Sequence, residues 1–332
     1  MRGFSIVICT YNPDRIIFQR LCQAIFSLSI PKDVCIEIII IDNNGNIPLS
    51  TFSWFKNLLQ FKPDIKCFVE LKPGLTNARI RGYKESSYEW IIFFDDDNEP
   101  SPNFLNILNN GLDQYPDLFC TGPGTIEVEY LVKKETRWLE LIKERFQERD
   151  YKIFSYSNNP EVYETFYPVG TGLVIHKSVM QEYTKRVEIG RYTLSDRKGK
   201  SLSSGGDLQI LFTGIDMKLK AGVLPGLCLK HLIPPQKTKV KYIEKQIYGT
   251  SSTCLLAHDQ VFPGFHFRAK VKNSIQIIKF VLPIIFFSII KNGFKSTRLK
   301  VAKIFGDINA NIVLQNHQAP LVIKIYEYLI GQ

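Results

Sequence analysis

The sequence lacks the patterns that would assign it to several common classes of protein. None of its seven cysteines forms a Cys-x-x-Cys pair. An odd number scattered through apolar runs is typical of reduced thiols, and it argues against a disulfide framework or a zinc site. No internal repeat or low-complexity tract occurs, and no Gly-x-Gly-x-x-Gly follows the first apolar run, which disfavours a nicotinamide-dependent dehydrogenase.

Long uninterrupted hydrophobic runs are also missing. The first apolar run, residues 4–9, is too short for the core of a signal peptide, so we expect a cytoplasmic protein that begins with a buried strand. Residues 274–290 are largely apolar, but Lys279 and Pro283 interrupt them, and a spanning helix needs about 20 predominantly apolar residues. This segment therefore predicts an interfacial helix or a core helix of a small helical subdomain.

Charge is distributed unevenly along the chain. Residues 230–332 contain 15 Lys and Arg against 4 Asp and Glu, a net charge of +11. The preceding 229 residues contain 27 basic and 28 acidic residues, a net charge of −1. A basic region of this kind favours an anionic partner such as a membrane surface, nucleic acid or a phosphate-rich substrate.

Strand and helix patterns alternate in the amino-terminal part. Near-continuous apolar runs predict strands, short polar turns follow them, and apolar residues at helical spacing predict the helices between. The predicted strands are residues 4–9, 35–41, 66–71 and 90–94, and the first helices are residues 15–28 and 76–86. Further along, we expect helices at 138–148, 177–186 and 207–221 and a strand at 170–175. This alternation is typical of a parallel sheet covered on both faces by helices.

Polar side chains follow three of these strands at the point where each strand ends. They are Thr10-Tyr11-Asn12, Asp42-Asn43 and Asp95-Asp96-Asp97. Ligands of open α/β sheets bind at the carboxyl ends of the strands, so the three clusters predict one nucleotide site.

Three consecutive carboxylates at a strand end suggest a metal site. Adjacent carboxylates repel one another unless a cation lies between or beside them. Hard divalent ions take carboxylate and phosphate oxygens together, so acidic side chains can bind a diphosphate only through a bridging metal. An isolated Asp-Asp-Asp could equally be a solvated acidic turn, but its position directly after an apolar strand favours the metal site.

Four segments resemble, in order, the motifs of the family 2 glycosyltransferases, and the resemblance covers roughly residues 3–235. Residues 5–12 (Ser-Ile-Val-Ile-Cys-Thr-Tyr-Asn) resemble the opening strand and nucleotide loop, and residues 39–44 (Ile-Ile-Ile-Asp-Asn-Asn) resemble the second-strand element. Residues 74–82 (Gly-Leu-Thr-Asn-Ala-Arg-Ile-Arg-Gly) are similar to the Gly-x-x-x-Ala-Arg helix, and residues 94–100 resemble the Asp-x-Asp segment. The resemblance implies the GT-A fold, which is Rossmann-like with a mostly parallel central sheet.

The resemblance also implies roles for individual residues. Those expected to contact the donor nucleotide are Thr10, Tyr11, Asn12, Asp42, Asn43, Arg79 and Asp96. Asp97, with Asp95, would ligate Mn²⁺ or Mg²⁺. His231, in a His-x-Ile-Pro segment that resembles a bacterial polysaccharide subgroup, could complete this metal site or be a structural histidine at a strand end. Asn43 departs from the aspartate common in the family, which leaves the identity of the base open.

The second half of the motif region would serve the acceptor. In residues 202–210 the resemblance implies that Asp207 is the general base, although Gly206 stands where the family has an acidic residue. Asp207 alone would more simply cap a helix, because aspartate is a favoured N-cap. The segment Gly170-Thr171-Gly172 and the indole of Trp138 lie where family members contact the acceptor.

We therefore predict a GT-A domain over residues 1–235, with a nucleotide-sugar half at about 1–120 and an acceptor half at about 121–235. Residues 236–332 would form a basic, mainly helical extension. The expected activity is inverting, metal-dependent transfer of a sugar from a nucleotide-sugar donor, UDP-linked in our prediction, to a glycan or lipid-linked acceptor in surface polysaccharide synthesis. The expected location is the cytoplasm, peripheral on the anionic inner face of the cell membrane, with no nucleic-acid partner.

Two other classes of function stay open at this point. Asp95 and Asp97 also satisfy the Asp-x-Asp of haloacid dehalogenase-type phosphatases, but Glu99 stands where that family has Thr or Val. A non-catalytic sugar- or nucleic-acid-binding protein would account for the basic region and the 12% aromatic content. A processive polysaccharide synthase is disfavoured, because neither a multi-span region nor a Gln-x-x-Arg-Trp motif occurs.

Overall fold

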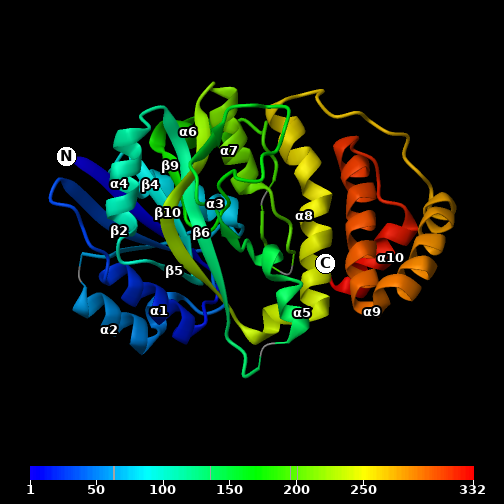
Figure 1. Ribbon diagram of the computed structural model, residues 1–332, viewed down its shortest axis with the longest axis horizontal. Coiled ribbons are helices and arrows are strands. Elements are labelled where there is room, and N and C mark those ends of the chain that lie inside the picture. The colour runs from blue at the N-terminus through cyan, green and yellow to red at the C-terminus, as the bar shows by residue number, and fades with distance from the viewer. Residues whose placement is uncertain (63, 135, 195, 200) are drawn as a thin grey trace. The chain divides into compact units, whose positions relative to one another are not determined.

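The computed structural model describes residues 1–62, 64–134, 136–194, 196–199 and 201–332, which fall into two compact units. The first unit comprises residues 1–190 and 210–234, and the second comprises residues 191–209 and 235–332 (Figure 1). The first unit is mixed α/β and contains every strand of the described sheet, whereas the second is mainly helical.

One mixed sheet forms the centre of the first unit. Its main path runs β3-β2-β1-β4-β9-β6-β10-β5, with β7 beside β6 and β8 beside β10. The strands are β1 (Arg2–Thr10), β2 (Val34–Asp42), β3 (Lys66–Val69), β4 (Trp90–Asp95), β5 (Asn98–Pro100), β6 (Leu118–Tyr130), β7 (Arg149–Asp150), β8 (Ser155–Ser157), β9 (Leu173–His176) and β10 (Lys220–Ile233).

The four strands predicted in the amino-terminal part are confirmed, and they form a continuous parallel block. β1 lies between β2 and β4, and β3 pairs with the outer side of β2, all in parallel. β9 then runs antiparallel to both β4 and β6, and β10 runs parallel to β6. β1 and β4 are almost wholly apolar and buried, as expected of strands covered on both faces.

Helices follow the strands and supply the rest of the core. The main helices that begin in the first unit are α1 (Arg15–Phe26), α2 (Ser53–Phe61), α3 (Leu75–Glu85), α4 (Phe104–Gln114) and α6 (Lys177–Glu188). Short turns of helix are η1 (Leu49–Thr51), α5 (Arg137–Glu140) and η2 (Lys143–Phe146). Asp14 fixes the start of α1, because its carboxylate accepts the backbone N–H groups of Ile16 and Ile17.

The bounds predicted for two helices are wrong. The expected helix at 138–148 is only the single turn α5 followed by η2, and Gln147 takes a left-handed conformation (φ 69°) that ends the helical path. The expected helix at 207–221 is α7 (Gly206–Asp216), which ends five residues earlier. Lys218 has a positive φ of 65°, and the chain from Lys220 onward pairs with β6 instead.

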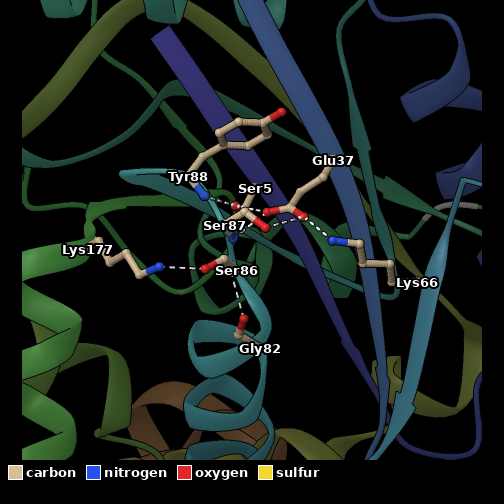
Figure 2. A network of polar contacts seen from close by, with 8 residues as sticks. All are labelled: Ser5, Glu37, Lys66, Gly82, Ser86, Ser87, Tyr88 and Lys177. Atoms are coloured by element: carbon tan, nitrogen blue, oxygen red, sulfur yellow. Dashed lines mark hydrogen bonds and ion pairs between the residues drawn. The ribbon is translucent and has the colours of Figure 1, made fainter.

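A polar network joins the first three strands near their amino ends (Figure 2). Glu37 of β2 accepts hydrogen bonds from Ser5 of β1 (2.6 Å) and Lys66 of β3 (2.8 Å). The backbone N–H of Ser87, in the turn before β4, donates to the same carboxylate at 2.6 Å. Burial raises the pKa of Glu37, but these hydrogen bonds and the charge of Lys66 outweigh it, so the pKa lies below its ordinary value.

The helical character predicted for the C-terminal extension is confirmed. The elements of the second unit after β10 are η3 (Pro235–Thr238), α8 (Val240–Val261), α9 (Ser274–Leu314) and α10 (Leu321–Ile330). α9 is not one straight helix, because Gly293 has φ 73° and ψ 173° and breaks it into segments 274–292 and 294–314.

Buried polar contacts hold the helices of the second unit together. Glu244 of α8 is 4% exposed, and its carboxylate pairs with Arg298 of α9 and accepts the hydroxyl of Tyr326 of α10. Tyr248 of α8 donates to Glu327 of α10 at 2.7 Å. A buried carboxylate is tolerated only with such partners, so this cluster specifies how the three helices pack.

Candidate functional site

The polar ends of β2, β1 and β4 lie side by side, as the strand pattern predicts. In the sheet register Thr10 pairs with Asp42 of β2, and the preceding Cys9 pairs with Asp95 of β4. The backbone N–H of Asn43 donates to the carbonyl of Thr10 at 2.9 Å, which continues the pairing beyond the strand end. All three polar clusters therefore meet at one edge of the sheet.

The loop after β1 presents exposed side chains at this edge. Tyr11 is 45% exposed, and Asn12 has a positive φ of 51°, a conformation that asparagine tolerates better than most residues. The side-chain oxygen of Asn12 accepts the backbone N–H of Asn46 at 2.8 Å. This bond ties the β1 loop to the β2 loop, so the two loops form one surface.

Asp42 and Asn43 are buried and anchor the surrounding loops. The Asp42 carboxylate accepts the backbone N–H groups of Gly45 (3.1 Å) and Leu49 (2.7 Å). The Asn43 amide donates to the carbonyl of Lys72 at 2.9 Å and accepts the N–H of Gly74 at 2.9 Å. Both residues shape the edge of the site through these bonds, whatever further contacts they make with a ligand.

The Asp95–Asp97 turn is held from two sides. Thr10 donates its hydroxyl to Asp96 at 2.5 Å. Asn98, which is fully buried, accepts the backbone N–H of Asp95 (3.1 Å) and donates to the Asp97 carboxylate (3.2 Å). The turn is therefore rigidly oriented, and Asp97 is 5% exposed.

Strand pairing brings His231 to Asp97. β5 pairs antiparallel with β10, with His231 opposite Asn98, and the N–H of Leu232 donates to the Asp97 carbonyl at 2.8 Å. The His231 Nε2 atom lies 3.4 Å from Asp97 Oδ1, and its Nδ1 atom lies 2.8 Å from the carbonyl oxygen of Phe146. Two residues far apart in the chain thus share one site.

The hydrogen bond to Phe146 determines which atom of His231 faces Asp97. A carbonyl oxygen only accepts, so Nδ1 must carry the hydrogen, and the neutral imidazole presents its Nε2 lone pair to the carboxylate. Two lone pairs that face each other need a proton or a cation between them. A metal-binding histidine commonly donates its other N–H to a backbone carbonyl in this way.

The residues at this position fit a divalent cation that is shared with a ligand. The 3.4 Å separation of Nε2 and Oδ1 is close to the spacing of about 3 Å between neighbouring ligands in an octahedral shell. Among the described residues, no group of three or more His, Cys, Asp and Glu side chains could hold a metal ion. A cation here would therefore need oxygens from a bound molecule, as Mg²⁺ commonly does with substrate phosphates.

Arg79 is buried on α3 close to the acidic turn. Its guanidinium lies 5.9 Å from the ring centre of Phe93, and its charge acts on Cys9 together with those of Asp95 and Asp96. Burial is the main reason that the pKa of the Cys9 thiol is raised to about 12. The charge of Arg79 lowers this pKa, and the charges of Asp95 and Asp96 raise it. Cys9 is therefore a neutral packing residue under the site.

The Gly170–Thr171–Gly172 segment reaches the same sheet edge through β9. β9 runs antiparallel to β4, with Leu173 opposite Phe93, so the residues just before β9 come beside the end of β4. Gly172 has φ +73°, and an added Cβ atom would lie 2.6 Å from Leu229 and 2.9 Å from Pro123. Only glycine fits at this close approach. Trp138 lies on α5 and is half-buried.

Asp207 belongs to the second unit, whereas the acidic turn belongs to the first. It lies in the first turn of α7, and its carboxylate accepts the N–H of Leu208 at 3.0 Å. Burial raises the pKa of the nearby Cys254 thiol to about 11, and the charge of Asp207 adds to this shift. α7 begins at Gly206, so Asp207 lies inside the first turn of the helix and is not its N-cap.

Several residues that support the site carry no motif. Asn98 orients the acidic turn, and the carbonyl of Phe146 fixes the tautomer of His231. Arg20 of α1 binds both Glu99 of β5 (2.6 Å) and Glu129 of β6 (2.7 Å), which ties the strand after the acidic turn to its surroundings. Asn98 and Glu99 follow the acidic motif, so their position is visible in the sequence, whereas the partners of these residues depend on the tertiary fold.

Many solved structures match this chain, among them two at low sequence identity. One is GalNAc-T7, a crystal structure with UDP, GalNAc and Mn²⁺, at 14% sequence identity and a TM-score of 0.49. The match covers 88% of this chain but only 58% of the GalNAc-T7 chain, so this chain spans less than two thirds of that structure. The other is residues 1–349 of TarS from S. aureus, also at 14% identity and a TM-score of 0.49, covering 100% of this chain and 92% of that one. No curated protein sequence matches the chain.

A family comparison adds a match over the strands and loops that form the site. The family described as "Glycosyl transferase family 2" matches residues 5–184, which is more than half of the chain. This range contains most of β1, all of β2 to β9 and the three polar strand ends. The chain therefore belongs to glycosyl transferase family 2, has the GT-A type of α/β fold and is a glycosyltransferase.

Proposed function

We propose that this enzyme transfers a sugar from a nucleotide-sugar donor, specifically a UDP-sugar, to a hydroxyl of a glycan or lipid-linked acceptor. The observation that carries the proposal is the convergence of Thr10, Asp42, the Asp95–Asp97 turn and His231 at one edge of the sheet. Membership of a glycosyltransferase family leaves the phosphatase and the non-catalytic binding protein without support.

In this proposal the loops after β1 and β2 bind the nucleoside. Tyr11 and Asn12 supply an exposed aromatic face and polar groups, and Asp42 and Asn43 hold the loop backbones in position. Arg79 stands beside the acidic turn, where a guanidinium can hold the turn or the diphosphate.

Asp97 and His231 would hold Mn²⁺ or Mg²⁺, with Asp95 nearby in the same turn. When bound, the cation neutralises the charge that develops on the departing nucleoside diphosphate. The oriented Nε2 atom of His231 and the fixed Asp97 carboxylate supply a nitrogen and an oxygen ligand without rearrangement, because hydrogen bonds already fix both side chains.

Asp207 is the proposed general base. A carboxylate within hydrogen-bond reach of the acceptor hydroxyl takes its proton as the oxygen attacks the anomeric carbon, opposite the leaving diphosphate, which inverts the configuration there. In this proposal the segment 170–172, beside the end of β4, lies on the acceptor side of the site, and Trp138 offers an aromatic face for a sugar.

The proposed biological role is surface polysaccharide assembly, with the enzyme bound peripherally to the cytoplasmic face of the membrane. The basic composition of residues 230–332 supports this location, because anionic lipids enrich that leaflet. A lipid-linked acceptor would be presented at the same surface.

A donor screen tests the proposal directly. Thermal unfolding is measured with a panel of nucleoside diphosphates and nucleotide sugars, each with Mn²⁺ and with a chelator. We expect stabilisation by a uridine nucleotide with Mn²⁺ and little stabilisation without the metal, since a ligand that binds only the folded state raises its stability. Equal stabilisation by all nucleotides with the chelator present would contradict both the metal and the uridine assignment.

A further inference from the structure

The first segment of α9, residues 274–292, is an apolar helix that the rest of the protein covers on one side only. By length and composition α9 is the one helix among the described residues that could cross a membrane, and only 17% of its most apolar window is buried. The residues buried on this segment are Ile277, Val281 and Ser288, a single stripe at helical spacing. The low burial argues against a core helix, one of the two alternatives for this segment.

The opposite side of this segment carries a continuous apolar row. Five side chains at spacings of three and four residues point away from the buried stripe, and each is 41% or more exposed. We call them the outer row: Ile275, Ile278, Leu282, Phe286 and Ile289. Phe280 and Phe287 lie on the other side of the buried stripe and are also exposed. An exposed apolar surface of this extent marks an interaction site.

We infer that the outer row of α9 inserts into one leaflet of an anionic lipid bilayer, with the helix lying parallel to the membrane plane. This inference rests on the proposed location at the membrane face and adds the element and the orientation by which the enzyme binds there. The lipid is favoured by the charge of the surrounding sequence. Residues 260–306 contain nine Lys and Arg and no Asp or Glu.

The charge distribution favours lipid over a second copy of the chain. Lys270 and Lys272 precede the segment, and Lys291 and Lys295 follow it. In a dimer through the outer row these like charges would face one another, which is unfavourable. On an anionic surface they are attracted to the headgroups, and Lys279 can extend its ammonium group to the same level while its stem stays with the apolar row.

The contacts of the segment argue for an in-plane helix and against a span. Gly293 breaks α9, and hydrogen bonds tie segment 294–314 back to the first segment and to the residues just before it. At the turn Thr297 donates to Ser288 at 3.0 Å, and at the far end the carbonyl of Ala269 accepts the side-chain amide of Asn311 at 2.8 Å.

A helix tied at both ends to a charged neighbour cannot cross the hydrocarbon core alone. Segment 294–314 contains Lys300, Lys303 and Asp307, and its Arg298 pairs with Glu244. Moving such groups through the bilayer core is costly. In the plane of the interface they stay in water while the outer row enters the lipid.

Flotation of the full-length protein with vesicles tests the inference. The vesicles contain phosphatidylcholine alone or phosphatidylcholine with phosphatidylglycerol. We expect the parent to float with the anionic vesicles and Leu282→Glu/Phe286→Glu to lose at least about tenfold in affinity. The matched control is Phe61→Glu, at an exposed phenylalanine on α2, which should bind as the parent does. Failure of the parent to float, or equal binding by the double variant, would overturn the inference.

Orientation is tested with tryptophan probes at Ile275, Leu282 and Ile289 and lipids brominated at shallow or deep positions. An in-plane helix predicts equal shallow quenching at all three, whereas deepest quenching at the middle probe would indicate a span and overturn the inference. Concentration-dependent dimerisation of the parent without flotation would instead identify a second copy as the partner. Retained uridine nucleotide and Mn²⁺ stabilisation in a protein that does not float would refute the membrane inference alone and leave the proposed transfer intact.

Discussion

His231 shows how one hydrogen bond can define the chemistry of a site. Its Nδ1 atom is committed to the carbonyl of Phe146, so only Nε2 can face Asp97. An imidazole held in this way is ready for a cation without reorientation, because its ring is already fixed. The histidine is recognisable from the sequence only as a candidate, since its partner Phe146 has no motif.

Replacing His231 should weaken metal binding. We expect His231→Gln to lose at least about tenfold in Mn²⁺ affinity, measured by calorimetry in the presence of the nucleotide, because the variant lacks the oriented imidazole nitrogen. His317→Gln, at an exposed histidine of the second unit, is the control and should bind Mn²⁺ normally. Unchanged affinity in His231→Gln would remove this residue from the proposed metal site.

Asp207 allows a test that separates chemistry from donor binding. We expect Asp207→Asn to lower kcat by about 10²–10⁴-fold, the usual contribution of a general base, while the donor dissociation constant changes little. Asp117→Asn, at an exposed aspartate before β6, should keep full turnover. If Asp207→Asn turns over as the parent does, Asp207 is a helix-start residue only.

At the scale of elements, the approach of α3 to β1 sets the position of Arg79. Gly82 lies on α3 where an added Cβ atom would be 2.3 Å from Val7 of β1. The glycine therefore lets the helix lie against the strand. Arg79, one turn earlier on α3, depends on this distance to stay beside the acidic turn.

Enlarging Gly82 should force α3 away from the sheet. We expect Gly82→Ala to reduce the free energy of unfolding by about 1–3 kcal/mol, the range for an overpacked core, and to weaken donor binding as Arg79 shifts. Gly214→Ala on α7 is the control, because its nearest side-chain atoms are 3.6 Å away and alanine favours a helix. Urea unfolding measures the free energy of unfolding of both variants. Adding Val7→Ala to Gly82→Ala should recover part of the lost stability, because it removes the side chain that the new methyl group meets.

The elements that the sequence can predict are those with one dominant pattern. β1, β2 and β4 are nearly continuous apolar runs, and the polar residues at their ends identify one edge of the sheet from the sequence alone. The local pattern does not predict β6 and β10, because Gly122-Pro123-Gly124 and Pro225-Gly226 interrupt them and look like turns. Both long strands are stabilised by pairing with each other, a tertiary effect that local sequence does not carry.

The same limit applies to the site. Thr10, Asp42 and Asp95 to Asp97 follow predictable strands, so their proximity is expected from a parallel sheet alone. The closeness of His231 to Asp97 depends on β5, a three-residue strand, and on β10, neither of which has a pattern of its own.

At the scale of the whole molecule, the Glu37 network and the site lie at opposite ends of the same strands. It joins β1, β2, β3 and the turn before β4 at the ends away from the acidic turn (Figure 2). The first three strands are thereby fixed at both ends, by this carboxylate at one and by the loop hydrogen bonds of Asp42 and Asn43 at the other.

This network should make stability depend on pH in the acid range. The pKa of Glu37 in the folded protein lies below its ordinary value of 4.5, so its stabilisation is present above about pH 4.5 and is lost as the pH falls through the lowered value. Glu37→Gln should cost about 1–2 kcal/mol at pH 7 by urea unfolding, and the difference from the parent should shrink toward about pH 3. Glu161→Gln, at an exposed glutamate, should show no such pH-dependent difference.

The pairing of β5 with β10 has a consequence for biosynthesis. Asp97 leaves the ribosome long before His231, so a growing chain holds the acidic turn well ahead of the imidazole that completes it. The nascent protein consequently lacks the paired nitrogen and oxygen ligands until β10 has been translated and docked. Metal capture should therefore be a late event of folding, delayed until the enzyme's largest strand pair has closed.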